Sequence, residues 1–254
     1  MKRTSDNPEI KMMFENYPKK RTELPEEYRK IYSVYYKKNR EGKMPASSLS
    51  QRMEAWLHRK VAGDVSGENN KSTLEIGAGT LNQLKYEQTK PYDIVEPFTE
   101  LYSDSEFKSS VREIFQDISQ VNGSKKYDRI TSIATFEHIT NLPEVVARTC
   151  ILLNENGCLR VSIPNEGTFL WTLGWRMTTG LEFKLRYGLD YRVLMNHEHV
   201  NTADEIETVL NYFYATVKCS CFGINKRIAL YRFYECTAPR VEVAEDYLKT
   251  ASTR

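Results

Sequence analysis

Two short stretches bring histidine and glutamate together, and they are the clearest candidates for acid–base chemistry in this sequence. Glu137 and His138 follow an apolar segment, and much later Glu198 stands between His197 and His199. An imidazole titrates near neutral pH and can take a proton from a hydroxyl or an amine. We therefore treat His138, His199 and His197 as candidate catalytic residues. The alternative for the first stretch is structural, with Glu137 and His138 orienting a loop and capping the next helix.

The alternating pair His197 and His199 also has the form of a metal site. Because no further ligand-type residues accompany the pair, we favour a substrate-facing or hydrogen-bonded structural role. A zinc site built from Cys219, Cys221 and a histidine is disfavoured, since the one-residue spacing is expected to direct the two thiols differently from a strand. We therefore expect no bound metal. The cysteines form an odd set without a Cys-x-x-Cys motif and are interpreted as reduced core thiols: Cys150, Cys158, Cys219, Cys221 and Cys236.

A second candidate site is the glycine-bearing turn in residues 74–80, Leu-Glu-Ile-Gly-Ala-Gly-Thr. Gly77 and Gly79 permit positive φ and let backbone N–H groups approach a ligand, at the positive end of the helix expected to follow. The apolar residues 92–95 predict a second strand, and this strand ends in Glu96. A carboxylate at that place can accept both hydroxyls of a ribose. The turn and Glu96 together indicate a nucleotide-type ligand.

The elements that must position these residues alternate along the chain. Strands are predicted at 73–76, 92–95, 111–115, 127–134 and 158–164, helices at 141–153 and from 202, and two closing strands at 215–222 and 227–236. A short helix or turn, brief for a crossover, is expected at 81–88. This alternation predicts an α/β fold with a Rossmann-like doubly wound sheet, mostly parallel, with one antiparallel strand near the C-terminus. Ligands of such sheets bind at the carboxyl ends of the strands.

The flanking segments divide the chain into parts. Residues 1–66 are expected to form an N-terminal arm and helices that serve as a cap or lid, with a stripe of tyrosines at 28–36 that packs or closes over substrate. Residues 67–240 form the main domain, in which 167–201 is an irregular substrate insert. Residues 241–254 are expected to be an exposed tail.

Composition places the chain among ordinary soluble proteins. Its 254 residues are 40% hydrophobic and 28% charged, with a net charge of +2. No apolar run approaches the roughly 20 residues needed to span a bilayer, and no apolar segment follows the first residues. We therefore expect a cytoplasmic protein without a membrane span. The small net charge does not favour nucleic acid as a partner, and the oligomeric state stays open.

Two cofactor interpretations compete for the glycine turn. A dinucleotide site wants a third glycine where this chain has Asn82. Residues 72–237 instead resemble the class I S-adenosylmethionine-dependent methyltransferases. The resemblance rests on the order and spacing of several motifs: residues 75–80, Glu96, Asp117 with Ile118, Tyr127-Asp128, residues 136–139 and residues 152–157. The departures are the short first crossover and Thr80-Leu81, where many members have another glycine.

The resemblance implies a role for each matching residue, with S-adenosylmethionine as the cofactor. The backbone of Gly77, Ala78 and Gly79 would wrap the amino-acid end of the cofactor, and Glu75 would assist with its ammonium. Further cofactor contacts fall to the residues after the other strands, with Glu96 on the ribose, Asp117 on the adenine amino group, Ile118 against the ring, and Thr135 at the mouth of the fourth strand. The alternatives are a solvated strand-end acid for Glu96 and a turn residue for Asp117.

The expected function is that of a methyltransferase acting on a small molecule or a glycan. The insert and the N-terminal helices resemble those of bacterial family members found with surface-polysaccharide biosynthesis, and this resemblance implies such a setting. Methylation of RNA or protein is the alternative within the same chemistry, since the first forty residues are basic. From a different class, an inactive cofactor-binding module or an NAD-dependent oxidoreductase stays open. The acceptor is expected at the insert because of its aromatic and basic residues: Phe169, Trp171, Trp175, Arg176, Phe183, Lys184, Arg186, Tyr187, Tyr191 and Arg192.

Overall fold

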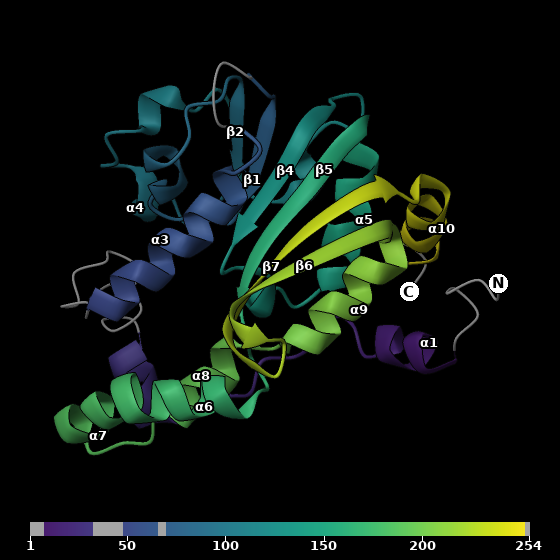
Figure 1. Ribbon diagram of the computed structural model, residues 1–254. Coiled ribbons are helices and arrows are strands. Elements are labelled where there is room, and N and C mark those ends of the chain that lie inside the picture. The colour runs from purple at the N-terminus through teal and green to yellow at the C-terminus, as the bar shows by residue number, and fades with distance from the viewer. Residues whose placement is uncertain (1–7, 33–47, 66–69, 252–254) are drawn as a thin grey trace.

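A seven-stranded sheet runs through the part of the chain that the computed structural model describes, residues 8–32, 48–65 and 70–251 (Figure 1). The strand order is β3-β2-β1-β4-β5-β7-β6. The strands are β1 (Thr73–Ile76), β2 (Tyr92–Val95), β3 (Ile114–Phe115), β4 (Tyr127–Ile133), β5 (Leu153–Pro164), β6 (Tyr214–Asn225) and β7 (Ile228–Pro239). The bounds predicted for β1 and β2 are confirmed, whereas β3 is shorter than predicted and β5 begins earlier.

The directions of the strands follow the prediction. β1 pairs in parallel with β2 and β4, placing Thr73 beside both Tyr92 and Arg129. β7 runs antiparallel to β5, with Leu159 opposite Cys236, and β6 in turn runs antiparallel to β7. The expected Rossmann-like α/β fold, mostly parallel with one antiparallel strand near the C-terminus, is confirmed. Strands of a sheet covered on both faces are buried on both sides, and all four residues of β1 and of β2 are buried.

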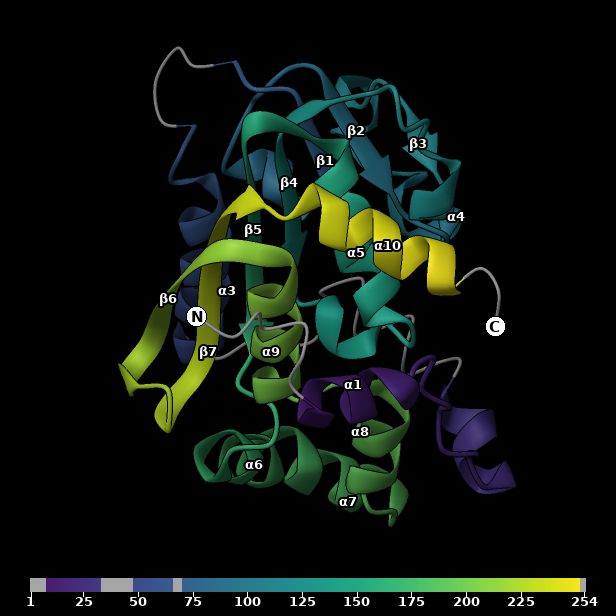
Figure 2. The same cartoon turned by 90° about the vertical axis from the view of Figure 1, so that its right-hand side faces the viewer.

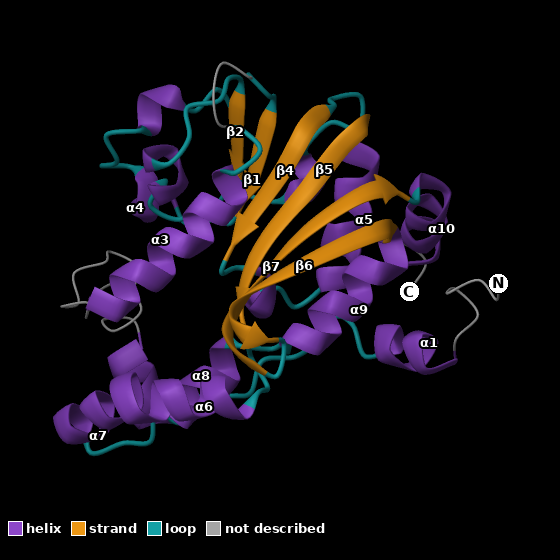
Figure 3. Ribbon diagram, viewed as in Figure 1, coloured by secondary structure: helices purple, strands orange, loops and turns teal. Residues whose placement is uncertain are grey.

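Helices cover both faces of this sheet (Figures 1, 2 and 3). α3 lies on one face against β4, β5 and β7, and α5, α9 and α10 lie on the other. The α-helices are α1 (Pro8–Glu15), α3 (Ser48–Ala62), α4 (Thr99–Tyr102), α5 (Leu142–Leu152), α6 (Phe169–Trp175), α7 (Leu181–Tyr187), α8 (Arg192–Glu198), α9 (Ala203–Phe213) and α10 (Val241–Ala251), and residues 26–32 are also helical. The short elements are the 3-10 helices η2 (Asn82–Lys85), η3 (Lys108–Ser110), η4 (Ile118–Gln120) and η5 (Phe136–His138), and the π-helical turn η6 (Arg176–Gly180).

Two buried arginines fix the end of α3 to the sheet. Arg129 on β4 donates to the carbonyl of Val61 at 2.9 Å, and Arg160 on β5 donates to the same carbonyl at 2.8 Å. Cationic side chains at a helix C-terminus satisfy its last carbonyls and favour its negative dipole end. Arg129 is fully buried and pairs with Glu87 at 2.7 Å, which compensates the cost of burying its charge. α3 therefore packs on the sheet as part of the main domain.

The insert is helical, which corrects the expectation of an irregular segment. α6, η6 and α7 follow one another without interruption, and α8 returns toward the sheet. Figure 1 shows these helices beyond the carboxyl ends of β4 and β5. Their inner face is apolar, so Phe183 and Tyr191 pack into one cluster with Leu24 and Tyr28 of the N-terminal arm. The tyrosine stripe therefore packs, as one interpretation predicted, but it packs on the insert. Tyr35 and Tyr36 of that stripe lie outside the described residues.

The expectation that residues 241–254 form an exposed tail is also wrong. The tail forms α10, whose Ala244 is buried and whose Tyr247 packs on Phe14 and Phe213 at 5.6 and 5.5 Å between ring centroids. Asn141 stands at the N-cap of α5, where its side-chain amide donates to Glu144 at 2.6 Å and makes no cap hydrogen bond.

The expectation that the strand directs the Cys219 and Cys221 thiols differently is wrong. The two residues share one face of β6, because residues two apart on a strand point the same way. The five cysteines are free thiols. Within the described ranges, no helix has the length and apolar character needed to cross a membrane.

Candidate active site

The glycine turn follows β1 at the carboxyl edge of the sheet. Gly77 has φ 71° and Gly79 has φ 52°, both in the left-handed region that favours glycine. A Cβ added to Gly77 would lie 2.3 Å from the side chain of Thr135, so the ends of β1 and β4 leave no room there. A Cβ added to Gly79 would meet nothing within 4 Å. The turn is thus fixed from beneath by Thr135 and open to a ligand at Gly79.

Glu96, the first residue after β2, holds this turn from its other side. Its Oε2 accepts a hydrogen bond from the Gly79 N–H at 2.8 Å, and its Oε1 accepts one from the Phe98 N–H at 3.0 Å. Only 1% of Glu96 is exposed, so the alternative of a solvated strand-end acid is wrong. Each carboxylate oxygen carries a second lone pair. Glu96 can therefore hold the turn and also accept a ligand hydroxyl that approaches it.

The residues predicted to contact adenine lie next along this edge. Asp117 caps η4 and accepts a hydrogen bond from the Ser119 N–H at 2.8 Å, which is the turn role weighed from the sequence. Its side chain is exposed, whereas Ile118 is 4% exposed and packs in the main core. The contacts of both residues with adenine stay predictions.

Glu75 points into the interior of the domain. Its carboxyl accepts a hydrogen bond from the Tyr92 hydroxyl at 2.8 Å, and 2% of the residue is exposed. Burial outweighs this hydrogen bond and raises the pKa of Glu75 to about 8. The structure thus keeps Glu75 protonated well above the usual range of a carboxyl group, and its assistance to a cofactor ammonium stays a prediction.

The element after the turn is much shorter than a helix that binds pyrophosphate. η2 has four residues, and Leu81 before it has a positive φ of 66°. A dinucleotide site places pyrophosphate at the N-terminus of a full helix that begins within the turn. The helix dipole expected from the sequence is therefore absent at this place, and the N–H groups of Gly77 and Gly79 donate to the Val95 carbonyl and to Glu96, each at 2.8 Å. The dinucleotide interpretation loses its helix as well as its third glycine.

His138 and His199 meet at the same edge, beyond β4 and β5. Their ring centroids are 4.8 Å apart and the rings are nearly perpendicular, at 85°. His138 lies in η5 directly after Glu137, whose Oε1 is 3.7 Å from His138 Nε2. His197 does not join them: its Nδ1 is 2.6 Å from the Thr22 carbonyl, and its ring packs edge-on to Tyr32. Of the three candidate histidines, the structure brings two together.

The two histidines are held together by main-chain hydrogen bonds. The N–H groups of Val200 and Asn201 donate to the Glu137 carbonyl at 2.8 and 3.1 Å. Asn201 is 1% exposed, and its side-chain amide donates to the Phe136 carbonyl at 2.8 Å while its oxygen accepts from the Tyr17 hydroxyl at 2.9 Å. The buried Asn201 therefore fastens the segment with His199 to the segment with His138.

Arg21 of the N-terminal arm also holds these segments together. We call His138, His199 and the residues that hold them the histidine assembly. Its guanidinium donates to the carbonyls of His197 and Glu198 at 2.8 and 3.0 Å, and to the carbonyl of His138 at 2.8 Å. The rigid fork of a guanidinium suits such a set of fixed acceptors. The arm is therefore part of the histidine assembly.

Glu166, which the sequence interpretation missed, positions His199. Its Oε2 is 2.7 Å from His199 Nδ1 and also accepts from the Trp171 indole at 2.6 Å. Burial alone would lower the pKa of His199, but the hydrogen bond with Glu166 and the nearby carboxylates raise it above the usual value. Burial would raise the pKa of Glu166, and the contact with His199 lowers it instead. The signal for Glu166 was present, because a carboxylate just beyond a parallel strand is what singled out Glu96.

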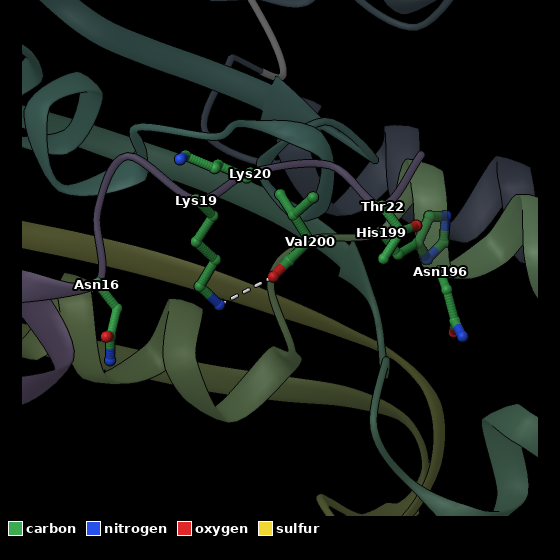
Figure 4. Close-up of a pocket in the computed structure, with 7 residues that line it drawn as sticks. All are labelled: Asn16, Lys19, Lys20, Thr22, Asn196, His199 and Val200. Carbon is green, nitrogen blue, oxygen red and sulfur yellow. Dashed lines mark hydrogen bonds between the residues drawn. The ribbon is translucent and has the colours of Figure 1, made fainter. Parts of the chain in front are cut away.

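A shallow depression of about 430 Å³ reaches this assembly from outside (Figure 4). The N-terminal arm and the end of α8 line it, with Lys19 donating to the Val200 carbonyl at 2.8 Å. His199 is among the lining residues, together with Asn16, Lys20, Thr22 and Asn196. The histidine assembly is thus connected to the surface on this side.

The strand order, the glycine turn after β1 and a carboxylate after β2 define a Rossmann-like domain of the class I methyltransferase type. Residues 41–211 match a family described as a methyltransferase domain. The chain belongs to this family, and the prediction of a class I S-adenosylmethionine-dependent methyltransferase is confirmed.

Solved structures agree with the fold. The plantazolicin methyltransferase BpumL, in complex with a pentazolic desmethylPZN analog and S-adenosylhomocysteine, is 17% identical with a TM-score of 0.56, over 84% of this chain and 91% of that one. The N-methyltransferase NodS from Bradyrhizobium japonicum WM9, in complex with S-adenosylhomocysteine, is 14% identical with a TM-score of 0.50, over 76% of this chain and 90% of that one. No curated protein matches this chain in sequence.

Proposed function

We propose that this methyltransferase binds S-adenosylmethionine at the glycine turn and transfers its methyl group to a small molecule or to a glycan. The observation that carries the proposal is the pairing of an open glycine backbone at Gly79 with a histidine assembly at the same sheet edge. S-adenosylmethionine supplies a methyl group on a positively charged sulfur. The chain must then bind the donor, hold the acceptor in line with it and exclude water.

The donor is bound by residues at the ends of the first four strands. The backbone of residues 77–79 wraps the cofactor's amino-acid end, Glu96 accepts from its ribose, and Asp117 and Ile118 contact adenine. Thr135 fixes the glycine turn from below. The support for this assignment is the fit of the turn, where a side chain is excluded at Gly77 and space is open at Gly79.

The acceptor binds at His138 and His199, with the insert beside them. The two side chains are 21% and 13% exposed, which admits a small molecule or the end of a chain more readily than a folded macromolecule. Trp171 and Tyr231, in edge-on contact at 5.3 Å between ring centroids, border Glu166 and offer an aromatic surface to a sugar or a ring. BpumL is by its name a plantazolicin methyltransferase, and its structure holds a desmethylPZN analog. A role in surface-polysaccharide biosynthesis is the finer form of the proposal.

Calorimetry and a transfer assay test this proposal. We expect the protein to bind S-adenosylhomocysteine and not NAD, and to label small hydroxyl or amine acceptors, including glycans, from S-adenosylmethionine with a radioactive methyl group. Labelling of RNA or protein in preference to every small acceptor would favour the alternative acceptor class. Binding of NAD without binding of S-adenosylhomocysteine would overturn the proposal.

A further inference from the structure

Three potential metal ligands converge beyond β4 and β5. Glu137, His138 and His199 each offer one ligand atom, and these atoms lie within 4.8 Å of one another. A cation with bonds of about 2.1 Å holds its ligand atoms roughly 3.0–3.4 Å apart. The Glu137 Oε1 to His138 Nε2 distance of 3.7 Å is already close to that range. Small side-chain movements therefore suffice to close the three groups around an ion.

The outer partners of both imidazoles are those of metal-binding histidines. His138 Nδ1 is 3.0 Å from the Glu198 carbonyl oxygen, and His199 Nδ1 is 2.7 Å from Glu166 Oε2. Because both partners are oxygen acceptors, each Nδ1 donates its proton to them, and in the neutral form of each ring the lone pair is then on Nε2. Histidines that bind metals almost always donate their second N–H to a carboxylate or a carbonyl in this way. The tautomers are thus set for ligation before any ion arrives.

The charges around the two rings also favour a cation. Glu137 is 1% exposed, and the carboxylates of Glu166 and Glu198 contact the two imidazoles. Arg21 brings a positive charge to the same assembly, and its guanidinium donates to main-chain carbonyls. Carboxylates around the two imidazoles lower the energy of a divalent ion bound between them.

We propose that Glu137, His138 and His199 bind one divalent transition-metal ion. Two imidazoles and one carboxylate with positions left open is a ligand set that suits Zn²⁺, Fe²⁺, Mn²⁺ and Co²⁺. The pair differs from the one that the sequence suggested, because His197 contacts Thr22 and Tyr32 while His138 takes its place beside His199.

The ion gives the acceptor site a chemical preference, and this part of the inference rests on the proposed function. An acceptor hydroxyl that takes an open position on the ion loses its proton more easily, since the cation stabilises the oxyanion. The O–H bond breaks, the oxygen keeps the electron pair, and the proton leaves to water. The acceptor is therefore a hydroxyl compound, and one with two neighbouring oxygens can chelate the ion.

Metal titration of tag-free, full-length protein tests the site. After treatment with a chelator and desalting, the protein is titrated with Co²⁺ in a spectrophotometer and with Zn²⁺ in a calorimeter. We expect one equivalent to bind, with Co²⁺ giving visible absorption bands of a site with nitrogen and oxygen ligands. His138→Ala and His199→Ala should each weaken binding by about 100-fold or more, and Glu166→Gln by about 10–100-fold, as for other second-sphere partners.

His197→Ala is the matched control, because it removes a neighbouring imidazole whose ring contacts Thr22 and Tyr32. It should keep the metal affinity of the wild type. Binding of S-adenosylhomocysteine is measured on every variant, both to show that it is folded and to keep the two proposals apart. Equal metal affinity in the wild type and in both histidine variants would overturn the site, as would failure of the wild type to bind either ion. Failure of the wild type to bind S-adenosylhomocysteine would instead count against the proposed function.

Discussion

The glycine turn and the histidine assembly lie at the same edge of one sheet, yet they are built from different material. The turn is local and made of backbone: Gly77 and Gly79 are two residues apart, and Glu96 binds the Gly79 N–H at 2.8 Å. The histidine assembly is made of side chains from distant segments. Arg21, Asn201 and Glu166 hold His138 and His199 in place through hydrogen bonds of 2.7–3.0 Å.

This difference separates a general task from a particular one. Every acceptor needs the same donor, so the donor can be bound by main-chain groups whose positions depend on the fold alone. The acceptor varies, and its site depends on side chains that an arm and an insert bring to the fold. Substitutions at the two places should therefore affect different properties, and the predictions below use that separation.

The largest effect is expected for Gly77→Ala. A Cβ there would lie 2.3 Å from Thr135, and the residue has a positive φ, so the substitution should destabilise the protein by about 3 kcal/mol or more. Urea unfolding measures this loss. Gly79→Ala is the control, because it has a positive φ without any contact within 4 Å, and it should cost only about 1–2 kcal/mol. Equal stability of the two variants would contradict the role given to Thr135.

The next effect concerns pH. The pKa of Glu75 is raised to about 8 in the folded state, so its contribution to stability is lost as pH rises toward that value. Between pH 6 and pH 9 this burial should cost the wild type about 2–3 kcal/mol. Glu75→Gln cannot ionise and should lack this part of the pH dependence in urea unfolding. If both proteins lost stability in parallel over this range, Glu75 would not titrate as described.

A smaller effect is expected at Glu96. Glu96→Ala removes the acceptor of the Gly79 and Phe98 N–H groups together with the proposed ribose partner, and should weaken S-adenosylhomocysteine binding by about 1–3 kcal/mol. Calorimetry gives the value, and Glu100→Ala in the following helix is a matched surface control. Unchanged affinity in Glu96→Ala would remove Glu96 from the donor site.

The smallest effect is expected at Arg21, which touches neither proposed ligand. Arg21→Ala frees the carbonyls of His138, His197 and Glu198, and the loosened histidines should lower acceptor turnover about tenfold. Binding of S-adenosylhomocysteine should stay unchanged, and Arg21→Lys should recover part of the turnover. If Arg21→Ala lowered the affinity for S-adenosylhomocysteine by a larger factor than it lowered acceptor turnover, the arm would contribute to the donor site.

The same contrast explains what could be predicted from the sequence. The turn, Glu96 and the strands beside them were predictable because each leaves its own signal within a few residues: two glycines, a carboxylate at a strand end, and apolar runs. The pairing of His138 with His199 was not, since it depends on Asn201, Arg21 and Tyr17 meeting across the fold. The insert was predicted as irregular because its helices bury aromatic residues against the N-terminal arm, and that partner leaves no periodic signal within the insert itself.

One measurement tests the separation of donor and acceptor most directly: the calorimetric affinity of S-adenosylhomocysteine for the wild type, for Gly79→Ala and for the double variant His138→Ala/His199→Ala. We predict that Gly79→Ala loses about tenfold or more in affinity, because its Cβ enters the open space at the turn. The double variant should stay within about twofold of the wild type. Equal loss in both variants, or loss in the histidine variant alone, would contradict the assignment of the two sites.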